Sequence, residues 1–587
     1  MDTEKGAKID TAAEPEDLKA FPDEVPDYDA QRGVQQIEAT TLTWSKWSLA
    51  ALLINIWLIF LTNGFRGSIL AGLVPYVTSD FRSHSLMTVI DIVSRAITAS
   101  VYIPIAKLLD VWGRAEGFAL MVGSATLGVV LMATSQNLAT FCAAQVFYSI
   151  GFSGVIYTVA VLAADVTSLR NRGIAFAFTS SPYMITAFAG SKAAESFLLY
   201  VRNWRWGFGS FAIIVPAVCT PLFVLLKLQL RKAEKRGLIA EQIRKSWSLD
   251  RIWNAIVAFD CKYSIVSPIS QLTSMPAVPG VVLFAGGLTI FLLPFNLATH
   301  APNGWKTDYI IAMIIVGFLL LIAFGLYETY IAKQPFLKNK FLLDRSVIGA
   351  CLIDMTYQIS YYCWASYFTS FLQVVCNLSI AEAGYVNSTF QVVSGVLLFI
   401  VGYLIRRTGR FKWLFYVTVP IYTLGLGLMI AFRRPNQHIG YIIMCEILIS
   451  IGGSVFILLV QLACLAAVDH QHVAAVLALL YVSGSVGGAI GSTISGTIWT
   501  NTFAKALGMY LPESAQPQLL TIYSSLPAQL AYPVGSPERI AIQMAYGYGQ
   551  ARMLAAGVGV FGLSFGWMFL IRNQNVSKNG QTKGMVF

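Results

Sequence analysis

Four ionisable side chains lie within long apolar segments, where a charge is unfavourable and usually has a function. Asp91 and Arg95 are four residues apart in the segment 85–108, so a helix would place them on one face. Asp354 and Glu446 lie in two later apolar segments, where an isolated carboxylate binds a proton more readily than in water. We expect all four to couple transport to protons. The alternatives are a charge pair that pins two helices together and, for Glu446, a position near the membrane surface.

Aromatic side chains follow Asp354 at helical spacing. Tyr357, Tyr361, Trp364 and Phe368 fall on the same face of a helix as Asp354. An aromatic stripe is often a packing surface or an interface belt. A stripe that faces lipid would avoid the Asp, however, and Tyr and Trp combine a flat apolar area with a hydrogen-bonding tip. We therefore expect these four aromatic residues to bind a bulky cargo.

The elements that must position these residues are membrane-spanning helices. Of the 587 residues, 56% are hydrophobic and only 12% are charged, about half the charged share of a soluble protein. The apolar residues occur in blocks long enough to cross a bilayer as helices. Fourteen helices are predicted, near 47–72, 85–108, 115–135, 138–163, 171–198, 206–228, 278–297, 308–332, 346–372, 384–405, 412–432, 438–465, 472–500 and 552–572.

The excess of Lys and Arg in alternate loops predicts that both termini are cytosolic. The sequence thus predicts an all-α polytopic membrane protein of two pseudo-symmetric six-helix bundles plus two extra helices. Its parts are a disordered acidic cytosolic tail (1–46), an N-terminal six-helix bundle (47–228), a cytosolic loop (229–277), two linker helices (278–332), a C-terminal six-helix bundle (346–572) with an extracellular loop (501–551), and a cytosolic tail (573–587).

Composition and spacing argue against several other classes. The net charge of +11 resides in short loops beside apolar helices, without the basic groove of a nucleic-acid-binding protein. Neither the eight cysteines nor the five histidines show the spacing of a metal site. No nucleophile–base pair recurs at a consistent membrane depth. We therefore expect no nucleic-acid partner, no bound metal, no disulfide and no enzymatic activity.

Two short charged loops repeat one pattern in the two halves. Asp110, Gly113 and Arg114 in the first loop align with Arg406, Gly409 and Arg410 in the second. Each loop follows the second helix of a six-helix bundle when the helices at 278–332 are set aside. Such a repeat is typical of transporters built from two parallel halves. A single match of this length also arises by chance.

The first loop resembles the signature Gly-x-x-x-Asp-x-x-Gly-Arg-Arg/Lys of the major facilitator superfamily. Ala106 stands for the first Gly and Ala115 for the last basic residue. In that superfamily the Asp and Arg pair with neighbouring helix ends and hold one conformation. The resemblance implies a gating role for Asp110, Gly113 and Arg114. By the internal repeat we extend this role to Gly409 and Arg410.

Longer segments resemble the fungal siderophore–iron transporters, which have fourteen transmembrane helices. The similar segments are "PYVTSDF" (75–81), "DVWGRAEGF" (110–118), "FTSSPYMITAFAGSKAA" (178–194), "NWRWGFG" (203–209), "YQISYYCWASYFTSFLQVV" (357–375), "RRTGRFKWL" (406–414), "AAVDHQHVAA" (466–475) and "IWTNTF" (498–503). The extended outer loop before the last helix is similar too. The resemblance therefore covers almost the whole chain.

The resemblance implies proton-coupled import of ferric hydroxamate-type siderophores by alternating access between two states. It places Tyr546 in an extracellular gate that meets the cargo, and it brings Arg66 toward Asp91 and Arg95 as a further cargo-binding residue. The iron would enter as part of the chelate, so no cofactor is expected. We expect a monomer in the plasma membrane, with endosomal vesicles as the alternative location.

An exporter is the competing interpretation. Drug/proton antiporters carry a Gly-Pro-x-x-Gly-Gly motif in their fifth helix. The segment 171–198 contains Pro182 and Gly190 but not that motif, which argues against a drug exporter. Glutathione exchangers share the fold and stay open as an alternative, and a non-transporting sensor is disfavoured by the short predicted tails.

Overall fold

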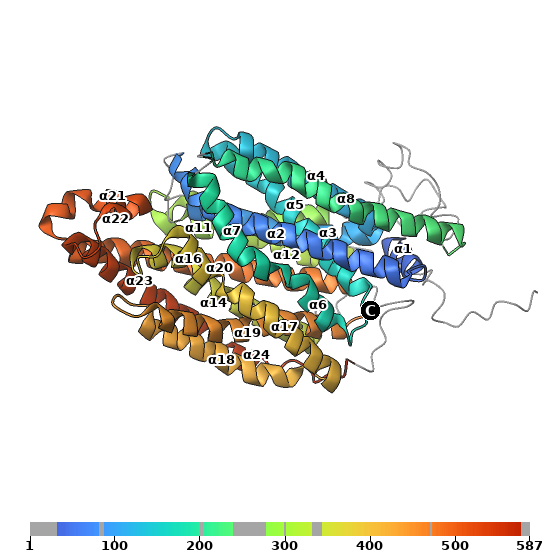
Figure 1. Ribbon diagram of the computed structural model, residues 1–587. Helices are drawn as coiled ribbons and strands as arrows, with labels where there is room; N and C mark the ends of the chain where they lie inside the picture. The colour runs from blue at the N-terminus through green and yellow to red at the C-terminus, as the bar shows by residue number, and fades with distance from the viewer. Residues whose placement is uncertain are drawn as a thin grey trace, which may run out of the picture.

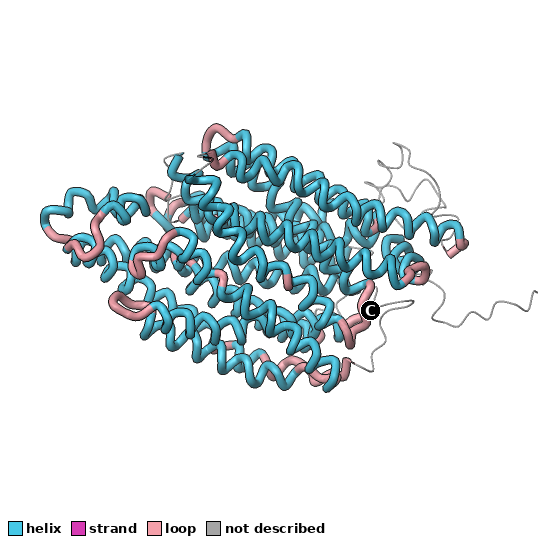
Figure 2. The backbone as a smooth tube through the Cα atoms, viewed as in Figure 1, coloured by secondary structure: helices cyan, strands magenta, loops and turns pink. Residues whose placement is uncertain are grey.

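The computed structural model describes residues 32–80, 87–199, 201, 203–238, 278–298, 301–331, 343–469 and 472–576. In these ranges the chain is almost entirely helical and contains no strand; Arg410 and Asn575 form an isolated bridge. The helices run side by side in one elongated bundle (Figure 1; Figure 2). The predicted all-α architecture is therefore confirmed.

The N-terminal half comprises six helical spans, the fifth of which is broken. Its elements are α2 (Lys46–Asp80), α3 (Met87–Trp112), α4 (Arg114–Thr134), α5 (Leu138–Asp165), α6 (Arg172–Ser180) with α7 (Pro182–Leu199), and α8 (Arg205–Lys235). The break lies at Ser181, because Pro182 has no backbone N–H to continue the hydrogen bonds of the helix. The last span continues to Lys235, beyond the predicted end at 228. The rest of the predicted loop, 239–277, lies outside the described residues.

Two further spans pack on the outside of the N-terminal half. Their elements are α10 (Val278–Leu292), α11 (Pro294–Leu297), the 3-10 turn η4 (Gly304–Lys306), α12 (Asp308–Leu326) and the π-helical turn η5 (Tyr327–Ile331). Helix α10 packs against α3, and Ser100 Oγ lies 3.3 Å from Thr289 Oγ1. Helix α12 leaves Phe318 and Leu319 more than half exposed. An apolar surface of this kind is stable in lipid.

The C-terminal half repeats the six-span pattern with more breaks. Its elements are α14 (Arg345–Ala365), α15 (Phe368–Val374), α16 (Ile380–Asn387), α17 (Thr389–Thr408), α18 (Lys412–Phe432), α19 (Ile439–Ala466), α20 (Val473–Tyr510), η7 (Glu513–Gln518), α21 (Leu519–Ser524), α22 (Leu526–Ala531), α23 (Pro537–Phe561) and α24 (Ser564–Trp567). In the described part of the chain, nine helices are long and apolar enough to cross a membrane. Several other predicted spans fall short of that criterion, some of them because they are broken.

We name the two ends of the bundle by the segments they carry. The loop end carries residues 110–114 and 406–412, and the cap end carries residues 511–536, whose α21 and α22 lie far from α1 (Arg32–Thr41) (Figure 1). Helix α1 packs on α3 and α8 at the loop end. The backbone N–H of Val576 donates to Gly409 O at 2.9 Å. Both ends of the described chain therefore lie at the loop end.

Two predicted segments need correction. The expected disordered tail (1–46) contains α1, whose Val34 and Ile37 are buried, because three-residue spacing places both on one helix face. Residues 1–31 lie outside the described residues. The expected non-helical loop 501–551 is largely helical. Phe503, Ala506 and Leu507 continue α20 with a buried face, and the Ser536 hydroxyl caps α23 by accepting from Arg539 N at 3.2 Å.

Candidate functional site

A cavity of about 440 Å³ lies between the two halves. The N-terminal half contributes residues from α2, α5, α6 and α7, and the C-terminal half contributes residues from α14, α17, α19 and α20. None of the described lining residues comes from α10 or α12. A site shared by two halves is where alternating access places a cargo.

The described part of the cavity wall is uncharged and amphipathic. None of the lining residues that the structure describes is Asp, Glu, Lys, Arg or His. Its polar groups are hydroxyls and amides, which donate and accept hydrogen bonds without net charge. They belong to Thr179, Ser180, Tyr183, Tyr357, Gln358, Tyr361, Tyr362, Gln391, Ser394, Ser454, Gln461 and Tyr481. Such a wall suits a large, uncharged ligand with an oxygen-rich surface.

The predicted aromatic stripe divides between the cavity and the protein interior. Tyr357 and Tyr361 line the cavity, whereas Trp364 and Phe368 do not. The helix ends at Ala365 because Tyr367 adopts a left-handed conformation, with φ of 59°. The Tyr367 ring stacks on Trp499 at a centroid distance of 4.4 Å. In this conformation the break removes Phe368 from the face that carries Tyr357 and Tyr361.

Trp364 and Phe368 instead surround a buried cation, Arg433. Its side chain is fully buried, donates to Trp364 O at 2.5 Å and lies 4.5 Å from the centre of the Phe368 ring. Glu446 is 1% exposed and interacts electrostatically with Arg433. Its carboxylate adjoins Thr389 without a hydrogen bond of good geometry. The expectation that Trp364 and Phe368 contact cargo is therefore wrong for this conformation, and Glu446 occupies a charged site behind the cavity wall.

Asp354 adjoins the cavity without lining it. The residue is 7% exposed, and its hydrogen-bonding neighbour is Gln358, a lining residue one helical turn further along. Its carboxylate fills the space over Gly484 of α20, where an added β-carbon would lie 2.3 Å from Asp354 Oδ2. A change in the protonation of Asp354 would therefore act on the packing of α14 against α20 and on the hydrogen bonds of Gln358.

Arg66 also lies outside the cavity wall, on α2. Its guanidinium donates to Tyr148 Oη and to Asn63 Oδ1, the latter at 2.7 Å, and it covers the Phe152 ring at 4.0 Å. Arg66 is held by protein groups in this conformation, and its contact with cargo stays a prediction. Asp91 and Arg95 belong to α3, but their side chains are outside the described residues.

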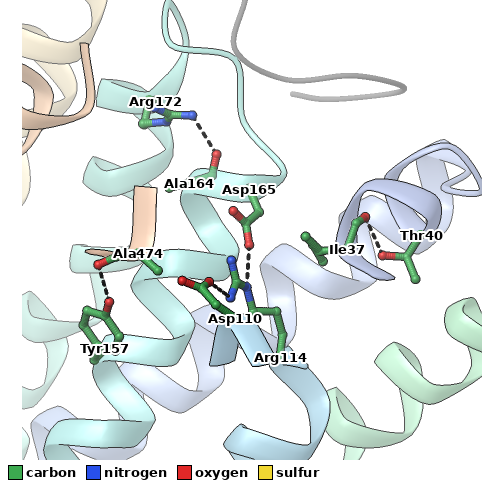
Figure 3. A network of polar contacts seen from close by, with 9 residues as sticks. All are labelled: Ile37, Thr40, Asp110, Arg114, Tyr157, Ala164, Asp165, Arg172 and Ala474. Carbon is green, nitrogen blue, oxygen red and sulfur yellow. Dashed lines mark hydrogen bonds and ion pairs between the residues drawn. The ribbon is translucent and has the colours of Figure 1, made fainter. Parts of the chain in front are cut away.

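The first charged loop is held by a buried ion network (Figure 3). Arg114 Nη1 donates to Asp110 Oδ1 at 2.7 Å, and Arg114 Nε donates to Asp165 Oδ2 at 3.1 Å. Lys107 adds a positive charge near Asp110. The network joins α3, α4 and the end of α5. Gly113 makes the connecting turn with φ of 115°, a conformation that favours glycine.

The second charged loop lacks such a network. Gly409 ends α17 with φ of 66°, but Arg406 and Arg410 are exposed and form no ion pair with another described residue. Position 406 carries a cation where the first loop has Asp110. Both loops therefore place a glycine at positive φ, with ψ of 157° at Gly113 and 5° at Gly409, whereas the ion network is found in the first loop.

The two halves meet directly at the loop end. Gly173 of α6 and Gly402 of α17 are in backbone contact, and a β-carbon at Gly402 would lie 2.9 Å from the Gly173 carbonyl carbon. Tyr157 Oη donates to Ala474 O at 2.5 Å (Figure 3), and Arg170 Nε donates to Arg406 O at 3.2 Å. These contacts close the loop end of the cavity in this conformation.

Tyr546 belongs to the cap end. It is 2% exposed, packs edge-on against Trp499 and Phe503, and donates to Gln529 Oε1 of α22 at 2.8 Å. Arg539 also anchors this segment, by donating to Gln529 O at 2.6 Å. In this conformation Tyr546 is buried and holds the cap in place. Its place in an extracellular gate that meets the cargo stays a prediction.

Comparison with known proteins identifies the family. The Major Facilitator Superfamily matches residues 56–492. A siderophore iron transporter of Emericella nidulans is 62% identical over 96% of this chain and 90% of that protein. A siderochrome iron transporter of Gibberella zeae is 62% identical over 98% of this chain and 92% of that protein. The chain belongs to the fungal siderophore–iron transporters of the major facilitator superfamily. The predicted family is thus confirmed.

Solved structures show the same fold at low identity. A human organic anion transporter superposes with a TM-score of 0.54 and 12% identity, covering 89% of this chain and 99% of its own. A peptide transporter gives a TM-score of 0.52 and 15% identity, covering 92% and 99%. The transporter therefore has the facilitator architecture, with its cavity at the junction of the two halves.

Several residues of the site were missed by sequence reasoning. Asp165 ends an apolar helix, and Arg433 follows one, so both resemble ordinary loop charges. Gln358, Gln391 and Gln461 lie inside apolar segments. A search for buried amides as well as charges would have found these three cavity residues.

Proposed function

We propose that this transporter imports ferric hydroxamate-type siderophores, driven by proton entry, through alternating access of one cavity. The observation that carries the proposal is the set of hydroxyls, amides and aromatic rings, all uncharged, among the described lining residues between the two halves. A chelate whose iron charge is balanced by its own ligands matches such a wall. The curated relatives named as siderophore iron transporters support this choice of cargo.

In this proposal the iron is part of the cargo and the protein needs no cofactor. Asp354 and Glu446 take up and release the protons. Both are buried next to elements that form the cavity, so their charge acts on the packing of α14, α17, α19 and α20. The transporter works as a monomer in the plasma membrane, with the loop end and both termini in the cytosol.

Uptake of radioiron tests the proposal. Iron-starved yeast without its own siderophore carriers would express the protein and receive several ferric hydroxamates, with and without a protonophore. We expect accumulation of at least one chelate, and we expect the protonophore to abolish it. Absence of uptake with the protein at the cell surface would favour the exporter.

The variants Asp354→Asn and Glu446→Gln test the coupling. Each keeps the shape of the side chain and removes the ionisable group. We expect concentrative uptake and its pH dependence to be lost in at least one variant, while exchange of chelate across the membrane at equal concentrations persists. Retention of both properties in the double variant would contradict the assignment of these carboxylates.

A further inference from the structure

A chain of hydrogen bonds connects a cation outside the cavity to a tyrosine in its wall. Arg66 Nη2 donates to Asn63 Oδ1 at 2.7 Å, and Asn63 Nδ2 donates to Tyr183 Oη at 2.8 Å. Tyr183 lines the cavity, whereas Arg66 and Asn63 do not. These two hydrogen bonds therefore link the position of the Arg66 guanidinium to the position of the Tyr183 hydroxyl.

The direction of these bonds is fixed by chemistry. A guanidinium has only donors, so the Asn63 atom that faces Arg66 must be its oxygen. The Asn63 amide nitrogen then faces Tyr183, and both of its hydrogens are donors. The Tyr183 oxygen must accept, so its own hydrogen points elsewhere. Among the described residues, the Tyr183 hydroxyl accepts this bond from Asn63 and donates none.

The surroundings hold the Tyr183 ring in this position. The ring packs edge-on against Phe60, another lining residue, at a centroid distance of 6.0 Å. Tyr183 lies at the start of α7, directly after the break at Ser181. Trp57 Nε1 donates to Ser181 Oγ at 2.9 Å, which fixes that break against α2. The hydroxyl is thus presented by a rigid support.

We propose that Tyr183 donates a hydrogen bond to an oxygen atom of the cargo, and that Arg66 and Asn63 are positioning residues that hold the hydroxyl hydrogen free for it. The inference rests on the proposed uptake of a ferric chelate and specifies how the chelate is recognised. The cargo must present an acceptor, such as a hydroxamate or amide carbonyl oxygen, toward α7.

The test uses the full-length protein and the concentration dependence of ferric hydroxamate uptake. Tyr183→Phe removes the donor and keeps the ring. Asn63→Asp keeps the bond to Arg66 but turns a carboxylate oxygen toward Tyr183, so that the hydroxyl donates to the protein. We expect each variant to raise KM about five- to tenfold with little change in Vmax per transporter at the cell surface.

The double variant separates this role from a general disturbance. In Tyr183→Phe there is no hydroxyl hydrogen for the new carboxylate to capture, so Asn63→Asp should add nothing further to KM. An additive effect would show that Asn63→Asp acts through its charge and would overturn the proposal. Asn55→Asp is the matched control, because Asn55 lies on the same helix and donates to Ala51 O. We expect its KM to equal that of the wild type.

The outcomes distinguish the inference from the proposed function. Uptake by the wild type with an unchanged KM in Tyr183→Phe would remove the inference alone. Absence of uptake by the wild type would remove the proposed function and the inference with it. Asn63→Asp changes no residue of the cavity wall, so it keeps the test decisive where Tyr183→Phe reaches the surface poorly.

Discussion

The two charged loops each turn at a glycine of positive φ, but they differ in what their side chains do. In the first loop, Arg114 is buried between Asp110 and Asp165. In the second loop, Arg406 and Arg410 are exposed. The comparison teaches that the two loops share a glycine at positive φ but not the same turn. Among the described residues, the ion network is found in the N-terminal half.

The second loop and the start of α20 instead supply main-chain acceptors to the other half. Arg406 O accepts from Arg170, and Ala474 O accepts from Tyr157. Both donors come from the N-terminal half and both acceptors are main-chain carbonyls of the C-terminal half. The first loop therefore holds its own half together, and the second participates in the junction between halves.

The largest difference between the loops is expected for their arginines. Arg114→Ala leaves Asp110 and Asp165 buried without their cation, which we expect to lower the free energy of unfolding by about 3–5 kcal/mol. Arg410→Ala removes an exposed charge, so we expect a change within about 0.5 kcal/mol. Thermal unfolding of the two purified variants measures the difference. Equal changes in the free energy of unfolding for the two variants would contradict the inferred difference between the loops.

An intermediate effect is expected at the junction of the halves. Gly402→Ala forces α17 and α6 apart, an overpacking penalty of about 1–3 kcal/mol that falls only on the conformation closed at the loop end. The measurement uses a cysteine introduced at Ser454 in the cavity and an impermeant thiol reagent added from the loop end. We expect this cysteine to react about tenfold faster when Gly402→Ala is also present than when Gly402 is kept. Gly427→Ala is the control, since nothing lies within 4 Å of its added carbon. An unchanged rate in Gly402→Ala would show that this contact does not close the cavity.

The smallest effect is expected for a single hydrogen bond across the junction. Tyr157→Phe removes the donor to Ala474 O and should weaken the closed conformation by about 1 kcal/mol. The same thiol labelling should then accelerate about fivefold. Tyr403→Phe, at an exposed position of α17, should leave the rate unchanged. Slower labelling in Tyr157→Phe would reverse the inferred role of this bond.

The sequence predicts the helices well because their cause is local. Long apolar runs set the spans, and repeated loops reveal the two halves. Breaks are less predictable: Pro182 signals one, but the break at Tyr367 depends on its stacking against Trp499, more than a hundred residues away. The helices inside 501–551 were not predicted, because their buried faces are short and interrupted by polar residues.

The site is only partly predictable for the same reason. Tyr357 and Tyr361 have the helical spacing that marks a common face, and both line the cavity. Phe368 has that spacing but leaves the face because the helix breaks at Tyr367, and its ring packs on Arg433. Trp364 lies before the break, and its main-chain oxygen accepts from Arg433. No local pattern connects Asn63 with Tyr183 or Arg114 with Asp165, since those contacts arise only when separate helices pack together.

Both ends of the described chain are anchored to the bundle, so sites beside them can serve as a pair of markers. Helix α1 is fixed to the N-terminal half, where a β-carbon at Gly33 would lie 2.3 Å from Leu109 O, and Val576 is fixed to the C-terminal half through Gly409 O. Fluorophores attached beside these anchors would move with different halves at the same end of the bundle. Their separation would read out the opening of that end in a working transporter, without a label in the transport path.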